Sequence, residues 1–249
     1  MVHWVPGLPA HVHALVTTRE QPGNLAAHVG DDPAEVILHR RQLHRLMPGV
    51  RPIQWLQQVH GTQVVELTNS ALPVTSRRAD ACVSRTANVP CAVLTADCLP
   101  VFMYRQNGDM VAAAHAGWRG LLGGVLSQTV SALRADQTPE QRAANPIHAW
   151  IGPAISQMAF EVGHDVRDVF LAKKPQFETF FRPSLQDLGK KWFADLPAMA
   201  EEWLRELGVH QVRSSDWCTY HDLQWSSHRR DPQSGRIASI IWFSSSSPR

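Results

Sequence analysis

The chain has few charged residues and almost no excess of either sign. Of its 249 residues, 18% are charged and 44% are hydrophobic. A chain with this balance buries a core and is not intrinsically disordered. The 24 basic and 22 acidic residues leave a formal net charge of +2. This near balance gives no reason to expect nucleic acid or a membrane surface as a partner.

Long apolar runs and paired cysteines are missing as well. No stretch of about 18 apolar residues occurs, so no membrane-spanning helix is expected. The first residues hold neither the basic nor the apolar segment of a secretory signal, and we predict a cytoplasmic protein. Cys82, Cys91, Cys98 and Cys218 form no CxxC pair. We therefore expect free, buried or metal-bound cysteines and no disulfide framework.

No internal repeat and no linker rich in proline, glycine or serine divides the chain. We predict one domain over residues 1–243 and a flexible, serine-rich tail over 244–249. Apolar spacing or capping residues predict four helices, over 33–47, 118–134, 161–173 and 196–207. Strands are predicted over 11–17, 52–56, 63–67, 89–95, 101–104, 110–115, 147–151, 210–214 and 236–243. Because the elements do not alternate strictly, the predicted fold is α+β, with mixed β-sheets flanked by helices.

Three potential metal ligands lie where predicted strands end. His60 lies in a turn between two strands, Cys98 interrupts an apolar run, and His115 ends another strand. Zinc prefers imidazole and thiolate ligands, and three protein ligands leave one position open for catalysis. Asp97 is placed to orient a ligating histidine. The separations along the chain match no local zinc motif, so a buried thiol with two hydrogen-bonded histidines remains the alternative.

A glycine-rich turn, residues 117–120, comes directly before a predicted helix. Backbone N–H groups at a helix start, together with Arg119, favour an anion such as phosphate. The alternative is an ordinary strand-to-helix turn with a solvated arginine. Arg19, after the first strand, and Arg229 and Arg230, near the C-terminus, are further candidates for anion binding. Surface ion pairs are the simpler interpretation of the last two.

Ten segments of the chain carry a resemblance to a known family. They run in order over nearly the whole sequence: Thr17-Thr18-Arg19, His28-Val29-Gly30-Asp31-Asp32-Pro33, Gln58-Val59-His60-Gly61, Ala79-Asp80-Ala81, Thr95-Ala96-Asp97-Cys98-Leu99-Pro100-Val101, His115-Ala116-Gly117-Trp118-Arg119-Gly120, Gly152-Pro153-Ala154-Ile155, Phe160-Glu161-Val162-Gly163, Cys218-Thr219 and Arg229-Arg230-Asp231. On these motifs the sequence resembles the YfiH or laccase-domain family. Its members are described as multicopper polyphenol oxidases and also as purine nucleoside phosphorylases.

The resemblance implies a single α+β domain and a zinc ion on His60, Cys98 and His115, with copper as the alternative metal. It also implies phosphorolysis of adenosine, inosine, guanosine and methylthioadenosine, and deamination of adenosine. The expected partners are a purine nucleoside and phosphate, bound by a monomer or a homodimer. Two alternative activities attach to the family: copper-dependent oxidation of phenols, and editing of peptidoglycan precursors by amide hydrolysis at the same metal site.

Further roles follow from the resemblance. The residues expected to bind phosphate or substrate are Arg119, Gly117, Trp118, Arg19 and Gln58. In deamination, water activated by the zinc ion would attack the purine C6 carbon, and Asp97 or Asp80 would carry the proton. The chain departs from the family pattern at residues 20–23, where Glu-Gln-Pro-Gly replaces a longer loop with paired glycines. We expect this loop to border the substrate, so the substrate range need not be that of the family.

Overall fold

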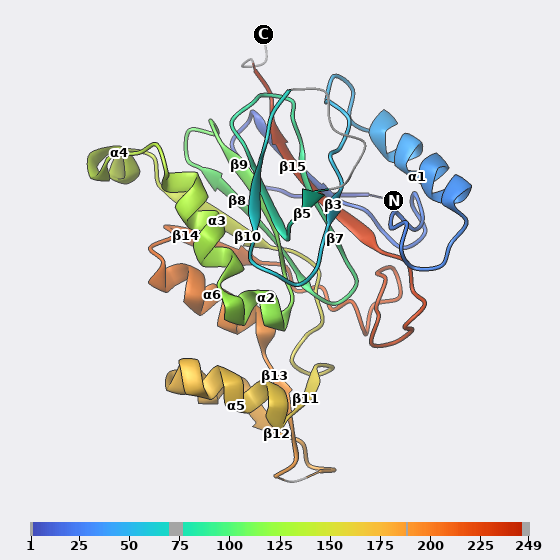
Figure 1. Ribbon diagram of the computed structural model, residues 1–249, viewed down its shortest axis with the longest axis vertical. Helices are drawn as coiled ribbons and strands as arrows, with labels where there is room; N and C mark the ends of the chain where they lie inside the picture. The colour runs from blue at the N-terminus through green and yellow to red at the C-terminus, as the bar shows by residue number, and fades with distance from the viewer. Residues whose placement is uncertain (1, 70–76, 188, 246–249) are drawn as a thin grey trace.

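The strands form two large sheets in the computed structural model, which describes residues 2–69, 77–187 and 189–245 (Figure 1). A four-stranded sheet has the order β1-β2-β15-β7, and a six-stranded sheet has the order β14-β10-β8-β9-β6-β4. The first sheet contains β1 (His3–Trp4), β2 (Val12–Val16), β7 (Cys91–Thr95) and β15 (Ile237–Phe243). The second contains β4 (Val64–Leu67), β6 (Ala81–Ser84), β8 (Leu99–Arg105), β9 (Val111–Ala116), β10 (Ile147–Ile151) and β14 (Gln211–Ser214).

Helices flank both sheets. They are α1 (Pro33–Arg45), α2 (Trp118–Gly123), α3 (Val125–Arg134), α4 (Pro139–Ala144), α5 (His164–Lys173), the 3-10 helix η1 (Pro175–Phe180) and α6 (Leu196–Glu206). Two small sheets complete the fold. One pairs β11 (Glu161–Gly163) and β12 (Phe181–Pro183) with β13 (Lys191–Ala194), and the other pairs β3 (Leu56–Gln57) with β5 (Arg77–Arg78).

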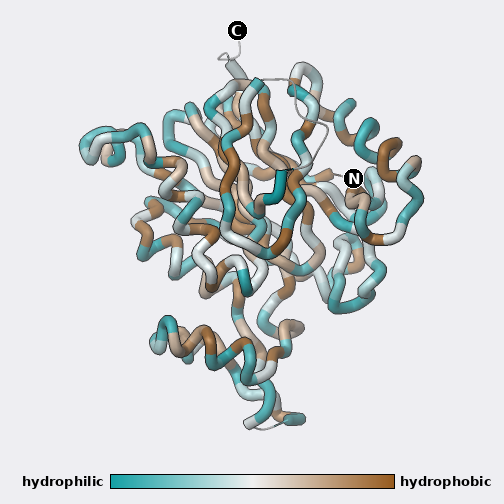
Figure 2. Tube along the Cα trace, viewed as in Figure 1, coloured by the Kyte–Doolittle hydropathy of each residue, from teal (hydrophilic) through white to brown (hydrophobic). Residues whose placement is uncertain are grey.

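Alternation along the strands explains how the layers stack. In β9, Val111 and Ala113 pack in a core between the two large sheets, whereas Ala112 and Ala114 face a second core that includes residues of α2, α3, α5 and α6. In β15, Ile240 faces a third core, under α1. Both faces of each large sheet are therefore covered, and the strands read as continuous apolar runs. Figure 2 shows apolar stretches in the central strands and hydrophilic residues along α4.

The predicted fold class is confirmed: one domain of mixed sheets flanked by helices. The predicted start of α1 is also confirmed, because the Asp32 side chain accepts a hydrogen bond from the Ala34 N–H and Pro33 is the first helical residue. Within the described chain, no helix has both the length and the apolar character needed to cross a bilayer. Of the predicted tail, residues 246–249 lie outside the described residues, and the Ser244 N–H donates to the His11 carbonyl at 2.9 Å.

Several predicted boundaries were wrong. The helix predicted over 118–134 is two helices, because Gly124 adopts φ 101° and ends the first. The segment predicted as helix from residue 161 begins as β11, and the strand predicted over 52–56 begins only at Leu56. No sequence pattern predicted β6 or the short elements between residues 175 and 194. β11 and β12 have three residues each, too few to show a period, and the four residues of β6 are all buried and do not alternate.

Candidate metal and substrate site

The three predicted metal ligands meet at one end of the two-sheet sandwich. Cys98 lies in the connection that carries the chain from β7, in the four-stranded sheet, to β8, in the six-stranded sheet. His115 lies near the end of β9, two residues from Ala113, so its side chain shares the face between the sheets. His60 lies in the loop between β3 and β4. One donor atom from each residue lies within 4.8 Å of the others.

Gly117 leaves room for this cluster. A Cβ atom at this position would lie 2.8 Å from Cδ2 of His60 and 2.9 Å from Sγ of Cys98. Contacts this short would force one of the two ligands to move. Gly117 was predicted in a phosphate-binding turn, and its lack of a side chain also lets His60 and Cys98 pack close together.

Asp80 fixes two of the three ligands from behind. It is fully buried. Its carboxylate accepts hydrogen bonds from the backbone N–H groups of Val59, His60 and Gly61 at distances between 2.7 and 3.1 Å. Nδ1 of His115 lies 2.9 Å from Oδ1 of Asp80. Because a carboxylate accepts, this Nδ1 donates, which leaves Nε2 of His115 available to a metal ion.

The backbone is held in unusual conformations beside the ligands. His60 has φ 58° and Asp97 has φ 91°, both in the left-handed region that residues other than glycine rarely adopt. Asp97 is held there by hydrogen bonds that its carboxylate accepts from the Thr219 hydroxyl at 2.7 Å and the Arg229 N–H at 2.6 Å. Such conformations persist when surrounding contacts fix them, and they concentrate at functional sites.

The charges of the cluster favour a thiolate. Burial raises the pKa of the Cys98 thiol, but His115 and His60 outweigh burial and bring this pKa to about 6. Burial lowers the pKa of His115, yet Cys98 and Asp80 raise it to about 9. Thiolate is the form in which cysteine binds a metal. Two imidazoles and a thiolate in this packing therefore fit a metal ion, and zinc and copper both accept this donor set.

Comparison with known proteins places the chain in a family. Residues 16–244 match the family model described as multi-copper polyphenol oxidoreductase laccase. The chain belongs to this laccase-domain family. The resemblance found in the sequence is thus confirmed.

Curated relatives and solved structures are similar to this chain over most of its length. The purine nucleoside phosphorylase YfiH of Escherichia coli K12 is 46% identical over 222 residues, which is 88% of this chain and 85% of that protein. The purine nucleoside phosphorylase PA4543 of Pseudomonas aeruginosa is 41% identical and covers 94% of each chain. The crystal structure of Neisseria meningitidis protein NMB0706 has 39% identity and a TM-score of 0.85, and it covers 98% of this chain and 99% of its own.

A cavity of about 360 Å³ opens over the ligand cluster of this laccase-domain protein. Two arginines, Arg119 and Arg236, and two histidines, His28 and His228, line it. No carboxylate lines it in the described part of the chain. Burial lowers the pKa of His28, and the positive charges of Arg236 and Arg40 add to this effect. The cavity therefore combines a metal-ligand cluster with an excess of positive charge, which suits an anionic ligand.

Only some of the predicted substrate residues line this cavity. Arg119 does, with its guanidinium 4.2 Å from the centroid of the Trp118 ring, whereas Trp118 itself packs against the core. Gln58 also lines it, but its amide group exchanges two hydrogen bonds with the Leu94 backbone, each 2.8 Å. Arg19 is exposed and does not line the cavity. Gln58 therefore ties the cavity wall to β7 as well as bordering the cavity.

The two predicted acidic residues lie behind the cavity wall. Asp80 performs the orienting role that the sequence analysis gave to Asp97, and Asp97 instead binds Thr219 and Arg229. The oxygens of both carboxylates accept hydrogen bonds from the chain. Proton transfer by either residue stays a prediction.

Arg229 and Arg230 were expected at surface ion pairs, but they bind backbone carbonyls instead. Arg229 donates to the carbonyls of Ala159 and Glu161. Arg230 donates to the carbonyls of Thr219, Tyr220 and Trp225 at distances from 2.6 to 2.7 Å. Both side chains fix loops around the site.

Three cavity residues, His28, His228 and Arg236, were not predicted. Of these, only His28 lay in a family-like segment, and Arg236 carried no sequence signal.

Proposed function

We propose that this protein is a purine nucleoside phosphorylase whose metal is a zinc ion held by His60, Cys98 and His115. One observation carries the proposal: a cluster with the donor set that zinc prefers opens into a cavity lined by two arginines. Relatives named purine nucleoside phosphorylase, at 41 to 46% identity over most of the chain, support the same conclusion.

Phosphorolysis exchanges one bond at the ribose. A phosphate oxygen forms a bond to the anomeric carbon while the bond from that carbon to the purine nitrogen breaks. The bonding electron pair leaves with the purine, which takes up a proton. Phosphate carries negative charge at neutral pH, so its approach requires cationic donors. Arg119 supplies them from the cavity wall. A zinc ion, when bound, supplies Lewis acidity beside these residues.

The finer substrate assignments belong to the same proposal. We expect adenosine, inosine, guanosine and methylthioadenosine as nucleosides, because the family resemblance implies them. We also expect deamination of adenosine, in which water replaces the exocyclic amine and ammonia leaves. Both reactions would share the purine site, but only phosphorolysis requires the anion-binding wall.

Metal-defined protein provides the test. Chelator-treated protein is reloaded with zinc or with copper and incubated with each nucleoside, with and without phosphate. We expect free base and ribose-1-phosphate only with zinc and phosphate together, and ammonia from adenosine without phosphate. Cys98→Ala should abolish all turnover. Cys82→Ala, which removes a thiol buried in the core between the sheets, should retain it. No base release from any nucleoside under any metal would overturn the proposal.

Copper-dependent phenol oxidation is the second candidate, because the matching family is described as a laccase. Laccase chemistry needs several copper ions, whereas the described residues contain one cluster of three ligands. Oxygen uptake by the copper-loaded protein with a phenol, unaffected by phosphate, would favour this activity over phosphorolysis.

A further inference from the structure

Arg236 is the second arginine of the cavity wall, and only one nitrogen of its guanidinium donates hydrogen bonds to the described part of the protein. It follows Gly235 in the loop before β15 and is half-buried. Nη1 donates to the carbonyls of Ser234 and Gly235. Among the described residues, Nε and Nη2 have no hydrogen-bond partner and the side chain has no ion pair. The contacts of Nη1 thus anchor a guanidinium whose other donors remain available.

Arg119 presents unused donors to the same cavity. The described residues offer its guanidinium no hydrogen bond and no ion pair. Its position is fixed instead by the Trp118 ring, 4.2 Å from ring centroid to guanidinium carbon, and Trp118 packs against the main core. A stacked arginine keeps its N–H groups free for another ligand.

Within the described part of the chain, the one anionic group that lines the cavity is the Cys98 thiolate, which the proposed zinc ion would bind. The lining contains no carboxylate in the part of the chain that the structure describes. Asp97 and the Cys98 thiolate raise the pKa of Arg236, although burial lowers it more. Both Asp97 oxygens already accept hydrogen bonds, from Thr219 and Arg229. Arg119 is exposed and Arg236 is half-buried, so an anion that enters the cavity meets two guanidiniums that pair with no carboxylate of the described lining.

We infer that Arg236 binds the phosphate cosubstrate together with Arg119, and that this arginine pair sets the preference for phosphate as the attacking group. The inference rests on the proposed function, which names phosphate as cosubstrate but assigns it to Arg119 alone. Phosphate has enough oxygens to accept from two guanidiniums at once, each as a fork of parallel bonds. Water needs neither arginine, so deamination should not depend on Arg236.

The first experiment measures phosphate binding without catalysis. Inorganic phosphate is titrated into the zinc-loaded protein by calorimetry, with no nucleoside present. Arg236→Gln removes the charge and should weaken phosphate binding about 10- to 100-fold, the range expected for charge-assisted hydrogen bonds. Arg236→Lys keeps the charge and should lose less. Arg51→Gln is the matched control, because Arg51 is exposed and lies outside the cavity, and it should bind phosphate as the wild type does.

The second experiment separates the substrates. For Arg236→Gln we expect KM for phosphate to rise by a similar factor, KM for inosine to change less than about twofold, and ammonia release from adenosine to persist. A merely structural role would raise both KM values and reduce ammonia release. Circular dichroism and urea denaturation of each variant verify that it is folded, and Arg236→Lys provides the test if Arg236→Gln is not.

The outcomes distinguish this inference from the proposed function. Unchanged phosphate affinity in both Arg236 variants, or no phosphate binding by the wild type, would overturn the inference and leave the activity assay to decide the function. Loss of phosphate binding in a protein that phosphorolyses no nucleoside would support the arginine pair and overturn the function. Adenosine 5′-monophosphate forms a third titration. If Arg236→Gln weakened its binding but not that of inorganic phosphate, the pair would serve a nucleotide instead, against the inference.

Discussion

Asp80 joins two ligands of the candidate site through one buried carboxylate. It holds the loop that carries His60 and also orients His115 through Nδ1. Carboxylates that orient a metal-bound histidine typically change metal affinity 10- to 100-fold when they are replaced. We therefore expect Asp80→Asn to bind zinc about 10- to 100-fold more weakly, as measured by competition with a chelator. The control is Asp165→Asn, which changes an exposed carboxylate on α5. Equal zinc affinity in both variants would show that Asp80 matters only for folding.

Gly117 allows a second prediction about single residues. Gly117→Ala should disrupt the ligand cluster, because its Cβ atom would approach His60 and Cys98 within 3 Å. The backbone is no obstacle, since φ at this residue is −66°. We expect at least a tenfold loss of zinc affinity in a protein that still folds. Gly163→Ala is the control, because the atom nearest to its new Cβ is a carboxylate oxygen of exposed Asp165, at the end of a flexible side chain. Wild-type zinc binding by Gly117→Ala would contradict the prediction.

The sequence predicted the three residues that the fold brings together, but not their surroundings. Their separations along the chain left a buried thiol with two hydrogen-bonded histidines as an alternative, and the family resemblance implied His60, Cys98 and His115 as the ligand set. Asp97, next to Cys98 in the chain, was predicted to orient a ligating histidine, whereas Asp80 reaches His115 through the pairing of β6 with β9. Arg236 was not found, because only the fold brings the loop before β15 to this cavity.

The break between α2 and α3 depends on a left-handed glycine. Gly124 has φ 101°, and its N–H caps the end of α2 by donating to the carbonyls of Gly120 and Leu121. A residue with a Cβ atom costs roughly 1–2 kcal/mol in such a conformation. Gly124→Ala should lower the free energy of unfolding by about that amount, and Gly124→Asn should lose less because asparagine tolerates this region better. Urea denaturation of both variants measures the difference. Stability losses that follow side-chain size alone would argue for a steric effect instead.

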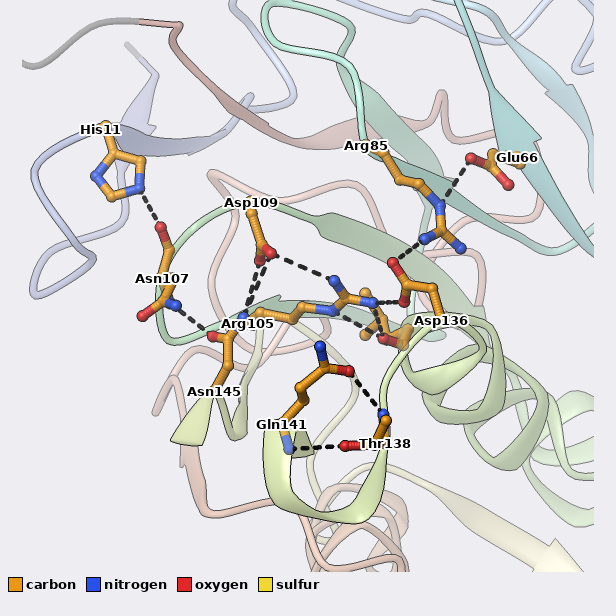
Figure 3. Close-up of polar contacts among 11 residues, drawn as sticks. His11, Glu66, Arg85, Arg105, Asn107, Asp109, Asp136, Thr138, Gln141 and Asn145 are labelled. Atoms are coloured by element: carbon orange, nitrogen blue, oxygen red, sulfur yellow. Dashed lines mark hydrogen bonds and ion pairs between the residues drawn. The ribbon is translucent and has the colours of Figure 1, made fainter. Parts of the chain in front are cut away.

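Arg105 ties several elements together at the end of β8 far from the candidate site (Figure 3). Its side chain is almost fully buried and donates to the Leu133 carbonyl at the end of α3. It also pairs with Asp136 and, at 3.3 Å, with Asp109. Arg85 pairs with Asp136 from the outside and is one-third exposed. The network thus contains a buried and a partly exposed arginine on the same carboxylate.

These two arginines allow a paired test. Arg105 is buried and also donates to the Leu133 carbonyl, and leaving such a buried acceptor unsatisfied costs about 1–3 kcal/mol, whereas a surface ion pair contributes about 1 kcal/mol or less. Arg105→Met should therefore lower the free energy of unfolding several times more than Arg85→Met, as measured by urea denaturation. Zinc affinity should be unchanged in both, because Cys98 precedes β8 and Arg105 ends it, about 20 Å apart along the strand. Equal destabilisation would mean that burial of Arg105 contributes little.

Element prediction succeeded where the pattern was long and buried. The apolar runs of β7, β9, β10 and β15 have five to seven residues, and the apolar spacing in α6 extends over eleven. Patterns of this length can be recognised in the sequence, whereas those of shorter segments cannot. The prediction failed at β6, which has four buried residues, and around β11 to β13, where pairing partners lie up to 32 residues apart. Tertiary pairing, which no local pattern encodes, decides such segments.

At the scale of the whole molecule, the layers place the site where the chain changes sheets. The connection from β7 to β8 must cross from one large sheet to the other, and this crossing leaves Cys98 at the open end of the sandwich. The three apolar cores lie between and outside the sheets. The cavity is therefore built from strand ends and loops, whereas the apolar cores between and outside the sheets stabilise the fold.

This separation predicts how the protein responds to loss of its metal. Purified protein should contain about one zinc per chain, by elemental analysis. Chelator treatment should abolish turnover, but the apo protein should keep its far-UV circular dichroism and a cooperative urea transition. The physical reason is that Asp80 already fixes the His60 loop and His115 without a metal. Bound zinc still stabilises by mass action, by about 4 kcal/mol at a thousandfold excess over Kd, so Tm should rise with free zinc in the wild type but not in Cys98→Ala. An unfolded apo protein would make the metal structural, and stoichiometric copper with little zinc would overturn the choice of metal.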